Sequence, residues 1–229
     1  MHALVCGGRR RHHARMPVIH ASLPANLAEH LHDNEIHVWQ LAYRAEQRRA
    51  PLRALLAAYL GVEAERLRLV DDAFGRPTLG TAHEQTLGFN WSHSGPHALV
   101  ALGRHIRPGI DVEWQRPRPR ALEIARRFFS TEEANALAAL PTDQRSAAFL
   151  DLWTAKEAVL KALGRGLAFG LHRLSIDRTV DSLTLRRLEQ DDANAWQLRP
   201  LLLDASLVAA LAWRGDPRQI RHFRLADAV

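Results

Sequence analysis

Two acidic residues two positions apart are the first candidates for chemistry in this chain. Asp111 and Glu113 lie in the segment 109–113, in which apolar and acidic residues alternate. On a β-strand such residues point to the same face, roughly 6.5 Å apart along the chain. Carboxylates suit a hard cation such as Mg²⁺, which usually takes one or two of them together with water and phosphate oxygens. The pattern indicates a shared cation, although a solvated strand face produces it more often.

Lysine placement is the second signal. The chain has 31 Lys and Arg residues, and its only lysines are Lys156 and Lys161, on either side of Glu157. Lysine is a compact point charge and arginine a planar fork, so the two are poorly interchangeable at a site built around one oxygen. The simplest alternative is an ordinary i,i+4 helix pair of Glu157 and Lys161, worth about 0.2–0.5 kcal/mol. Glu157 becomes a third cation ligand only if its helix packs beside the 109–113 strand.

A third polar group contains Asn90, Ser92, His93 and Ser94 in a segment that we expect to be turn-like. Neighbouring serine and histidine suggest a hydrolase, but adjacent residues on a strand diverge and the Gly-x-Ser-x-Gly nucleophile motif is absent. The segment is therefore either a polar turn that caps a core strand or a phosphate-binding segment with hydroxyl and imidazole donors.

Hydrophobic spacing predicts the elements that must position these residues. We expect strands at 35–41, 98–102 and 109–113, a turn at 74–77, helices at 44–60, 119–129 and 143–163, a further helix that opens at Ser130 with a capping box to Glu133, and strand pairs near 172–189 and 195–213. Gly61 and Gly164 are the expected helix stops. This mixture predicts an α+β fold in two similarly sized halves that meet near residue 107.

Domain organisation and location follow from composition. Residues 1–28 contain no Asp or Glu, so we expect a flexible N-terminal extension there, followed by an N-terminal half at 29–106 and a C-terminal half at 107–229. The single cysteine, Cys6, fits a reducing compartment and predicts the cytoplasm. No apolar run approaches the roughly 20 residues of a membrane span, so no membrane association is expected.

A net charge of +6 and a pI near 10.5 predict an anionic partner. A basic nucleic-acid-binding protein would explain the charge but not the clustering of lysines with acids, and no zinc-finger, RNP or phosphate-loop motif is present. A Mg²⁺-dependent hydrolase of nucleotides or phosphoesters would use the same carboxylates with water as the nucleophile. The nucleic-acid-binding protein and the hydrolase both stay open as alternatives. Our leading prediction, however, has no nucleic acid as a partner.

Three segments in order resemble the signature blocks of one enzyme family. Residues 89–94 (FNWSHS), 109–113 (GIDVE) and 153–161 (WTAKEAVLK) are similar to those of the surfactin-type 4′-phosphopantetheinyl transferases, of the holo-acyl-carrier-protein synthase superfamily. The turns at 74–77 and 164–167 also resemble the family, so the similarity covers about residues 44–213. The resemblance implies two similar α+β halves in a pseudo-two-fold arrangement, with the active site between them.

The resemblance also implies the reaction. The phosphopantetheine arm of coenzyme A would pass to a serine of an acidic acyl or peptidyl carrier protein, with Mg²⁺ present and adenosine 3′,5′-bisphosphate released. Asp111, Glu113 and Glu157 would hold Mg²⁺, with Glu157 also the candidate base and Lys161 a catalytic phosphate contact. Coenzyme A would further contact Arg44, Arg49, Arg76, Ser92, His93, Asp111 and Lys156. We expect a monomer.

Two further expectations depend on the family. The segment between Trp39 and Arg44 is shorter than usual for it, so Arg48 and Arg49 would supply contacts to the 3′-phosphate. The expected carrier-docking surface contains Arg116, Arg118, Arg120, Arg126, Arg127, Phe128 and Phe129, with a solvated helix face over a core phenylalanine as the alternative. If Lys161 touches phosphate, Lys161→Arg should be harmful and Lys156→Arg milder.

Overall fold

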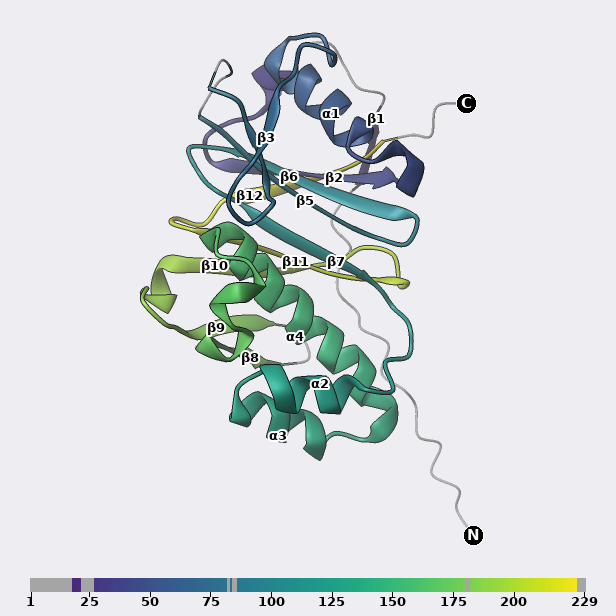
Figure 1. The fold of residues 1–229 in the computed structure, drawn as a ribbon, viewed down its shortest axis with the longest axis vertical. Coiled ribbons are helices and arrows are strands. Elements are labelled where there is room, and N and C mark those ends of the chain that lie inside the picture. Colours follow the sequence, from purple (N-terminus) through teal and green to yellow (C-terminus); the bar gives the residue numbers. More distant parts are fainter. Residues whose placement is uncertain (1–17, 22–26, 82, 84–85, 180–181, 226–229) are drawn as a thin grey trace.

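The computed structural model describes residues 18–21, 27–81, 83, 86–179 and 182–225. Residues 1–17 and 22–26, most of the predicted N-terminal extension, lie outside the described residues. Two β-sheets face each other in the middle of the molecule, with helix α1 (Ala50–Leu60) above and helix α4 (Thr142–Leu163) below (Figure 1). Short 3₁₀ helices at Leu27–His30 and Ala45–Gln47 precede α1.

The upper sheet has five strands in the order β1-β12-β2-β6-β5. Their bounds are β1 Val18–Ala21, β12 Gln219–Leu225, β2 Glu35–Ala42, β6 His97–Arg104 and β5 Leu87–Ser94. Strand β12 is parallel to both of its neighbours, while β2, β6 and β5 are antiparallel. The outer face packs on α1 through buried residues that include Trp39, Leu52, Leu56 and Val100.

The lower sheet has three antiparallel strands in the order β10-β11-β7. They are β10 Trp196–Leu201, β11 Leu207–Arg214 and β7 Gly109–Trp114. Its outer face packs on α4, beside α2 (Ala121–Phe128), α3 (Thr131–Ala139) and the hairpin β8 (Leu174–Arg178) and β9 (Leu183–Leu188). A second hairpin, β3 (Leu69–Asp71) and β4 (Pro77–Leu79), contains the predicted turn at 74–77.

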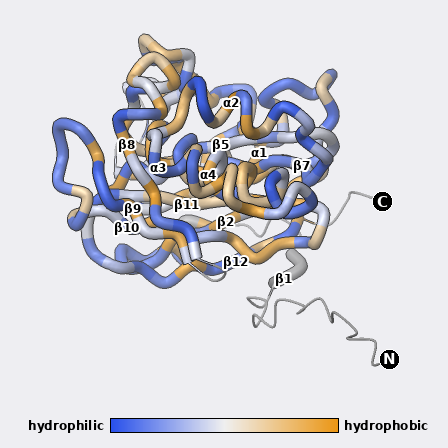
Figure 2. The backbone as a smooth tube through the Cα atoms, turned by 90° about the horizontal axis from the view of Figure 1, so that it is seen from below, coloured by the Kyte–Doolittle hydropathy of each residue, from blue (hydrophilic) through white to orange (hydrophobic). Residues whose placement is uncertain are grey.

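The inner faces of the sheets form a third core between them, from residues such as Ile36, Val38, Leu99, Ile110 and Trp213. Strand alternation sends one set of side chains into this core and the other toward the helices. In Figure 2, hydrophilic residues follow the outer loops while the interior strand β11 is largely hydrophobic. None of the helices in the described part of the chain is long and apolar enough to cross a membrane.

Most predicted elements are confirmed, including the α+β class, the Gly61 and Gly164 stops in left-handed conformation, and the Ser130–Glu133 capping box. Helix α1 begins at Ala50 rather than residue 44, because Arg48 has φ +48° and Pro51 favours the first helical turn. Residues 87–94 form strand β5 rather than a turn, since every residue pairs with β6.

One strand crosses the predicted domain boundary. Strand β12 falls in the predicted C-terminal half, 107–229, but it lies between β1 and β2 in the N-terminal sheet. Its sequence, QIRHFRL, is polar enough that no strand was expected there. The two halves otherwise repeat a strand order, β2-β6-β5 and β7-β11-β10. The pseudo-two-fold relation and the boundary near residue 107 stay predictions.

Gly109 sets the distance between β7 and α4. A Cβ atom at this position would lie 2.0 Å from the carbonyl oxygen of Ala158 and 2.4 Å from the backbone nitrogen of Ala162. Only glycine allows the strand and the helix to pack this closely. This approach brings the side chains of α4 within reach of Asp111, two residues along the strand.

Candidate functional site

The three polar segments of the sequence meet where β5, β7 and α4 come together. Asp111 of β7 is the centre of the contacts: its Oδ1 accepts hydrogen bonds from Ser92 Oγ at 2.7 Å and from Lys161 Nζ at 2.7 Å. The Lys161 ammonium also donates to the carbonyl oxygen of Ile110 at 3.1 Å. Asn90 fixes the strands by accepting from the Ile110 backbone nitrogen at 2.9 Å. The structure therefore brings together Ser92, Asp111 and Lys161 from far-apart parts of the chain.

Glu113, two residues further along β7, also contacts one serine and one basic side chain. Its Oε2 accepts from Ser94 Oγ at 3.2 Å and from an Arg118 guanidinium nitrogen at 2.9 Å. Ser94 Oγ also accepts from the Trp114 backbone nitrogen. Burial and the charge of Asp111 raise the pKa of Glu113. Each carboxylate of β7 thus carries one serine hydroxyl and one cation.

Glu157 is the third carboxylate, and it has no cation of its own in the way that Asp111 and Glu113 have. Among the described residues, Oε1 of Glu157 is buried without a hydrogen-bond partner, and so is Oδ2 of Asp111. Burial raises the pKa of Glu157 to about 7, and the negative charges of Asp111 and Glu113 add to the effect. Glu157 therefore exchanges a proton near neutral pH, which a general base must do.

The donor set fits Mg²⁺ in chemistry and charge. Three carboxylates share two cations, Lys161 and Arg118, and two buried oxygens are unsatisfied. Oxygen ligands and an unbalanced negative charge are what a hard divalent cation prefers. In the described part of the chain, however, no three acidic, His or Cys side chains already converge as a metal-binding cluster. Asp111 and Glu113 are instead occupied by Lys161 and Arg118.

A cleft of about 420 Å³ opens beside Glu157 and Lys161. One wall is the β3–β4 turn with Phe74, and the other is the end of α4 with Leu167 just beyond it. Phe74 and Leu167 are 54% and 55% exposed, which is unusual for large apolar side chains. Trp91 of β5 also lines the cleft. The cleft offers apolar walls at its mouth and charged groups within, as a nucleotide-like substrate requires.

Arg76 is a structural clamp at the same cleft. Its guanidinium donates to the carbonyl oxygens of Lys161, of Phe89 at 2.6 Å and of Pro108 at 3.2 Å. Burial lowers the pKa of Arg76 to about 10, so it stays charged at neutral pH. It thereby ties α4, β5 and the start of β7 together. Arg76 lines the cleft as expected for a coenzyme contact, but these hydrogen-bond donors point to backbone carbonyls.

The predicted coenzyme contact of Lys156 is not supported, because its side chain is sealed in the core. Lys156 is 0% exposed, and its Nζ pairs with Glu133 Oε2 at 2.7 Å. The same ammonium donates to the carbonyl oxygens of Leu171 at 2.9 Å and Leu174 at 2.6 Å. Lys156 lies about 140° around the helix from Lys161, at 100° per residue, which directs the two lysines to different sides of α4.

His93 lies on the opposite face of β5 from Ser92, as alternation requires. Its ring stacks on Tyr43 with centroids 4.3 Å apart, and burial together with the charge of Lys161 lowers its pKa. Arg44 follows Tyr43 in the chain and is exposed. The predicted contacts of His93 and Arg44 with coenzyme A stay predictions.

Arg49 lies further away, on the helix α1 side. It pairs with Asp71 of β3 at 2.6 Å. Together with Arg48 and Arg53 it lines a separate shallow concavity of about 740 Å³. The predicted contacts of Arg48 and Arg49 with the 3′-phosphate stay predictions.

Comparison with known proteins agrees with this geometry. A family described as the 4′-phosphopantetheinyl transferase superfamily matches residues 107–212. A protein of Nostoc sp., the 4′-phosphopantetheinyl transferase HetI, is 38% identical over 168 residues, which cover 73% of this chain and 69% of the relative. A protein of Synechocystis sp. that bears the same enzyme name is 34% identical over 171 residues, covering 72% and 69%. The transferase Sfp of Bacillus subtilis is 33% identical over 128 residues, covering 55% and 54%.

The chain belongs to the 4′-phosphopantetheinyl transferase superfamily. The relatives include a surfactin-type enzyme, as the signature blocks predicted.

The carrier-docking residues predicted for this transferase divide into two groups. Arg126, Arg127 and Phe128 are exposed at the end of α2, and Phe128 is 43% exposed. Phe129 is instead a core residue that stacks on Phe149 with centroids 5.4 Å apart.

The remaining three arginines each have a local contact. Arg120 pairs with Glu123, Arg116 lies over the Trp114 ring, and Arg118 contacts Glu113. Among these predicted docking residues, those at the end of α2 combine exposed arginines with an exposed phenylalanine.

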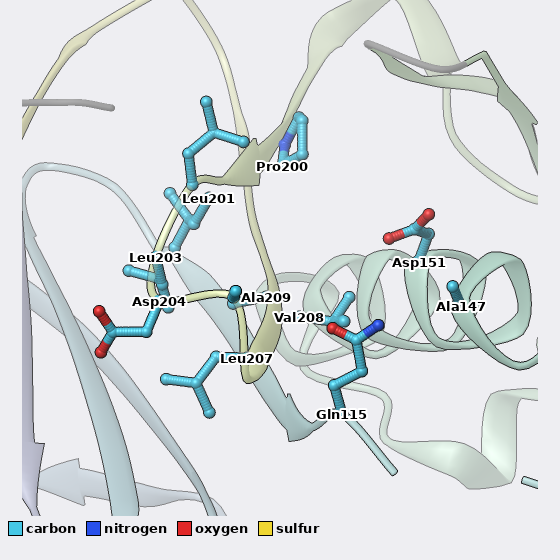
Figure 3. Close-up of a pocket in the computed structure, with 12 residues that line it drawn as sticks. Gln115, Ala147, Asp151, Pro200, Leu201, Leu203, Asp204, Leu207, Val208 and Ala209 are labelled. Atoms are coloured by element: carbon cyan, nitrogen blue, oxygen red, sulfur yellow. The ribbon is translucent and has the colours of Figure 1, made fainter. Parts of the chain in front are cut away.

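A third concavity is lined by none of these residues. It measures about 310 Å³ and lies between α4, at Ala147 and Asp151, and the β10–β11 loop, at Leu203 and Asp204 (Figure 3). It contains none of the predicted site residues. The cleft beside Glu157 is the one that coincides with the signature blocks.

Two contacts were not expected from the sequence. Arg118 was grouped with surface arginines, although it contacts a predicted metal ligand. Ser94 belonged to the signature block, but no role was assigned to it until the structure placed it on Glu113. The only sequence signal for Ser94 is its spacing, since Asn90, Ser92 and Ser94 share one strand face and meet β7 at successive positions.

Proposed function

We propose that this chain transfers the 4′-phosphopantetheine arm of coenzyme A to a serine of an acyl or peptidyl carrier protein, with Mg²⁺, and releases adenosine 3′,5′-bisphosphate. The observation that carries the proposal is the meeting of Asp111, Glu113, Glu157 and Lys161 beside the cleft. The names of the relatives support the reaction class. We also propose a cytoplasmic monomer.

Coenzyme A would enter the cleft with its pyrophosphate toward Lys161. Among the described residues one N–H of the Lys161 ammonium has no acceptor, so it can donate to a phosphate oxygen while keeping its contacts with Asp111 and Ile110. The apolar walls at Phe74, Trp91 and Leu167 suit the base and the pantetheine chain. Arg48, Arg49 and Arg53 provide positive charge for the 3′-phosphate.

Asp111, Glu113 and Glu157 would hold Mg²⁺. The unsatisfied oxygens of Asp111 and Glu157 and the mutual repulsion of the three carboxylates support this. When bound, the ion would neutralise charge on the pyrophosphate in the transition state. Lys161 would stabilise the same charge from the protein side. Ser92 and Ser94 orient the carboxylates by donating to them.

Glu157 would take the proton. The carrier serine oxygen forms a bond to the β-phosphorus, and the bond from that phosphorus to the bridging oxygen breaks. The hydroxyl proton passes to the Glu157 carboxylate, and the electron pair leaves with adenosine 3′,5′-bisphosphate. A pKa of about 7 lets Glu157 accept the proton at neutral pH and release it afterwards.

The test is incubation with coenzyme A, Mg²⁺ and a panel of apo carrier proteins, read by intact mass. We expect addition of one phosphopantetheine group to at least one carrier, with loss of most turnover in Asp111→Asn, Glu113→Gln and Glu157→Gln at unchanged melting temperature or above it. Consumption of coenzyme A without carrier modification would favour the Mg²⁺-dependent hydrolase instead. Retained turnover in one variant would remove that residue from the metal site.

A further inference from the structure

Arg118 is fixed at the edge of the site by its backbone. It lies between Pro117 and Pro119 in the segment that joins β7 to α2, and prolines on both sides restrict the chain. Its backbone nitrogen donates to Ser146 Oγ of α4 at 3.0 Å. The side chain therefore starts from a held position and reaches back toward β7.

The guanidinium is only partly satisfied. One terminal nitrogen donates to Glu113 Oε2 at 2.9 Å, and the Arg118 side chain is 33% exposed. Nε is buried and has no acceptor among the described residues. A buried donor without a partner costs free energy. This arrangement differs from Lys161, whose ammonium is tied both to Asp111 and to a backbone carbonyl.

Glu113 is the acceptor that Arg118 and a metal ion would share. Its Oε2 already accepts from Ser94 and Arg118, so a cation that binds through this oxygen competes with the arginine there. Arginine therefore satisfies in the free protein the charge that a divalent ion would otherwise satisfy.

We propose that Arg118 is a positioning residue that holds Glu113 in the free enzyme and competes with Mg²⁺ for it. The competition makes the free enzyme a weak Mg²⁺ binder. When the anionic pyrophosphate enters, it offers the partly satisfied guanidinium another acceptor and leaves Glu113 to the metal. This inference rests on the proposed function, because it takes Glu113 as a metal ligand.

The test is titration of the free protein with Mn²⁺, as a spectroscopic substitute for Mg²⁺, in the absence of coenzyme A and carrier. Arg118→Gln should tighten the Mn²⁺ dissociation constant by about five- to tenfold. The matched control is Arg116→Gln, since Arg116 lies over the Trp114 ring rather than on a carboxylate, and it should leave the constant unchanged. In the Glu113→Gln background, adding Arg118→Gln should have no further effect.

An unchanged or weaker Mn²⁺ constant in Arg118→Gln, or no measurable Mn²⁺ binding by either protein, would overturn the inference. If Arg118→Gln does not fold, Arg118→Lys is measured in its place. Its Mn²⁺ dissociation constant should lie between the wild-type value and the roughly five- to tenfold lower value expected when the charge is lost completely. The titration needs no transfer reaction. If the carrier assay shows transfer but the Mn²⁺ dissociation constant is unchanged in Arg118→Gln, the proposed role of Arg118 is wrong and the proposed function still stands.

Discussion

The two lysines of α4 form two ion pairs of the same length, 2.7 Å, that differ in burial and in how far their polar atoms are satisfied. Lys156 and Glu133 are 0% and 5% exposed, and all three ammonium donors have an acceptor. Lys161 and Asp111 are 25% and 8% exposed, and the pair faces a cleft. One helix therefore presents a sealed pair to the C-terminal core and an open pair to the site.

The sealed pair stabilises the fold, whereas the open pair is available for chemistry. Glu133 also caps α3 and accepts from the Ile176 backbone nitrogen at 2.9 Å, so the sealed pair joins α3, α4 and β8. Such a network is stable only while every member is satisfied. The open pair retains an unused donor and an unsatisfied Asp111 oxygen, so it can accept a new partner without losing the fold.

Breaking the sealed pair should have the largest effect. Lys156→Met leaves the Glu133 charge buried without its cation, which costs about 3–5 kcal/mol of unfolding free energy. Chemical denaturation measures it. Lys156→Arg should also destabilise, because three acceptors within 2.9 Å leave no room for a planar guanidinium. A native denaturation midpoint for Lys156→Met would mean that the network contributes little.

Breaking the open pair should damage turnover instead. We expect Lys161→Met to lower kcat/KM for coenzyme A by about 10²–10³-fold, since it removes a charge that stabilises the developing phosphate charge. Lys161→Arg should be harmful as well, at about tenfold, because the guanidinium does not fit an ammonium site. Melting temperature should change little in both. Native kinetics in Lys161→Arg would show that any positive charge suffices.

Glu157 tests the open side through pH. Because folding raises the pKa of Glu157 from 4.5 to about 7, it favours the protonated form. Its contribution to stability is full below pH 4.5 and is lost as pH rises through about 7. Without metal, Glu157→Gln should therefore be more stable than wild type above pH 7, by about 3 kcal/mol, and nearly equal to it at pH 4.5. Denaturation at several pH values in a chelating buffer checks this, and a constant difference across the range would contradict it.

The smallest effect should come from the exposed end of α2. The double reversal Arg126→Glu and Arg127→Glu should raise the KM for an acidic carrier severalfold and flatten its salt dependence, with the KM for coenzyme A unchanged. Reversal of Arg186, exposed on β9 and paired with Asp177, is a control at a different face. Carrier kinetics that do not respond to the double reversal would place docking elsewhere.

Local patterns predicted most of the fold. The capping box, the glycine stops and the apolar periods are short-range features, and they placed α3, α4, β2 and β6 closely. Strand β12 was missed because its arginines and histidine hide the alternation. The start of α1 was placed too early because the positive φ of Arg48 leaves no mark on the sequence.

Less of the candidate site than of the fold could be predicted from the sequence. Residue types identified Asp111, Glu157 and Lys161, and the structure brings them together. What a side chain touches depends on which side of a helix another element covers, which is why Lys156 as well as Lys161 was expected to contact coenzyme A. Arg118 and Arg76 show the same limit, since each contacts groups that are distant in the sequence or on another element.

Because of strand β12, the sheet that carries part of the site can be completed only late in the synthesis of the chain. The pairing of β12 joins residue 35 to residue 219, so β2 keeps an open edge until residue 219 and those after it in β12 have been synthesised. Contacts between such distant residues slow folding, and an open strand edge can pair wrongly with another molecule. The N-terminal sheet that carries Ser92 cannot be completed ahead of the C-terminal half, so both halves should gain their final structure in one late step.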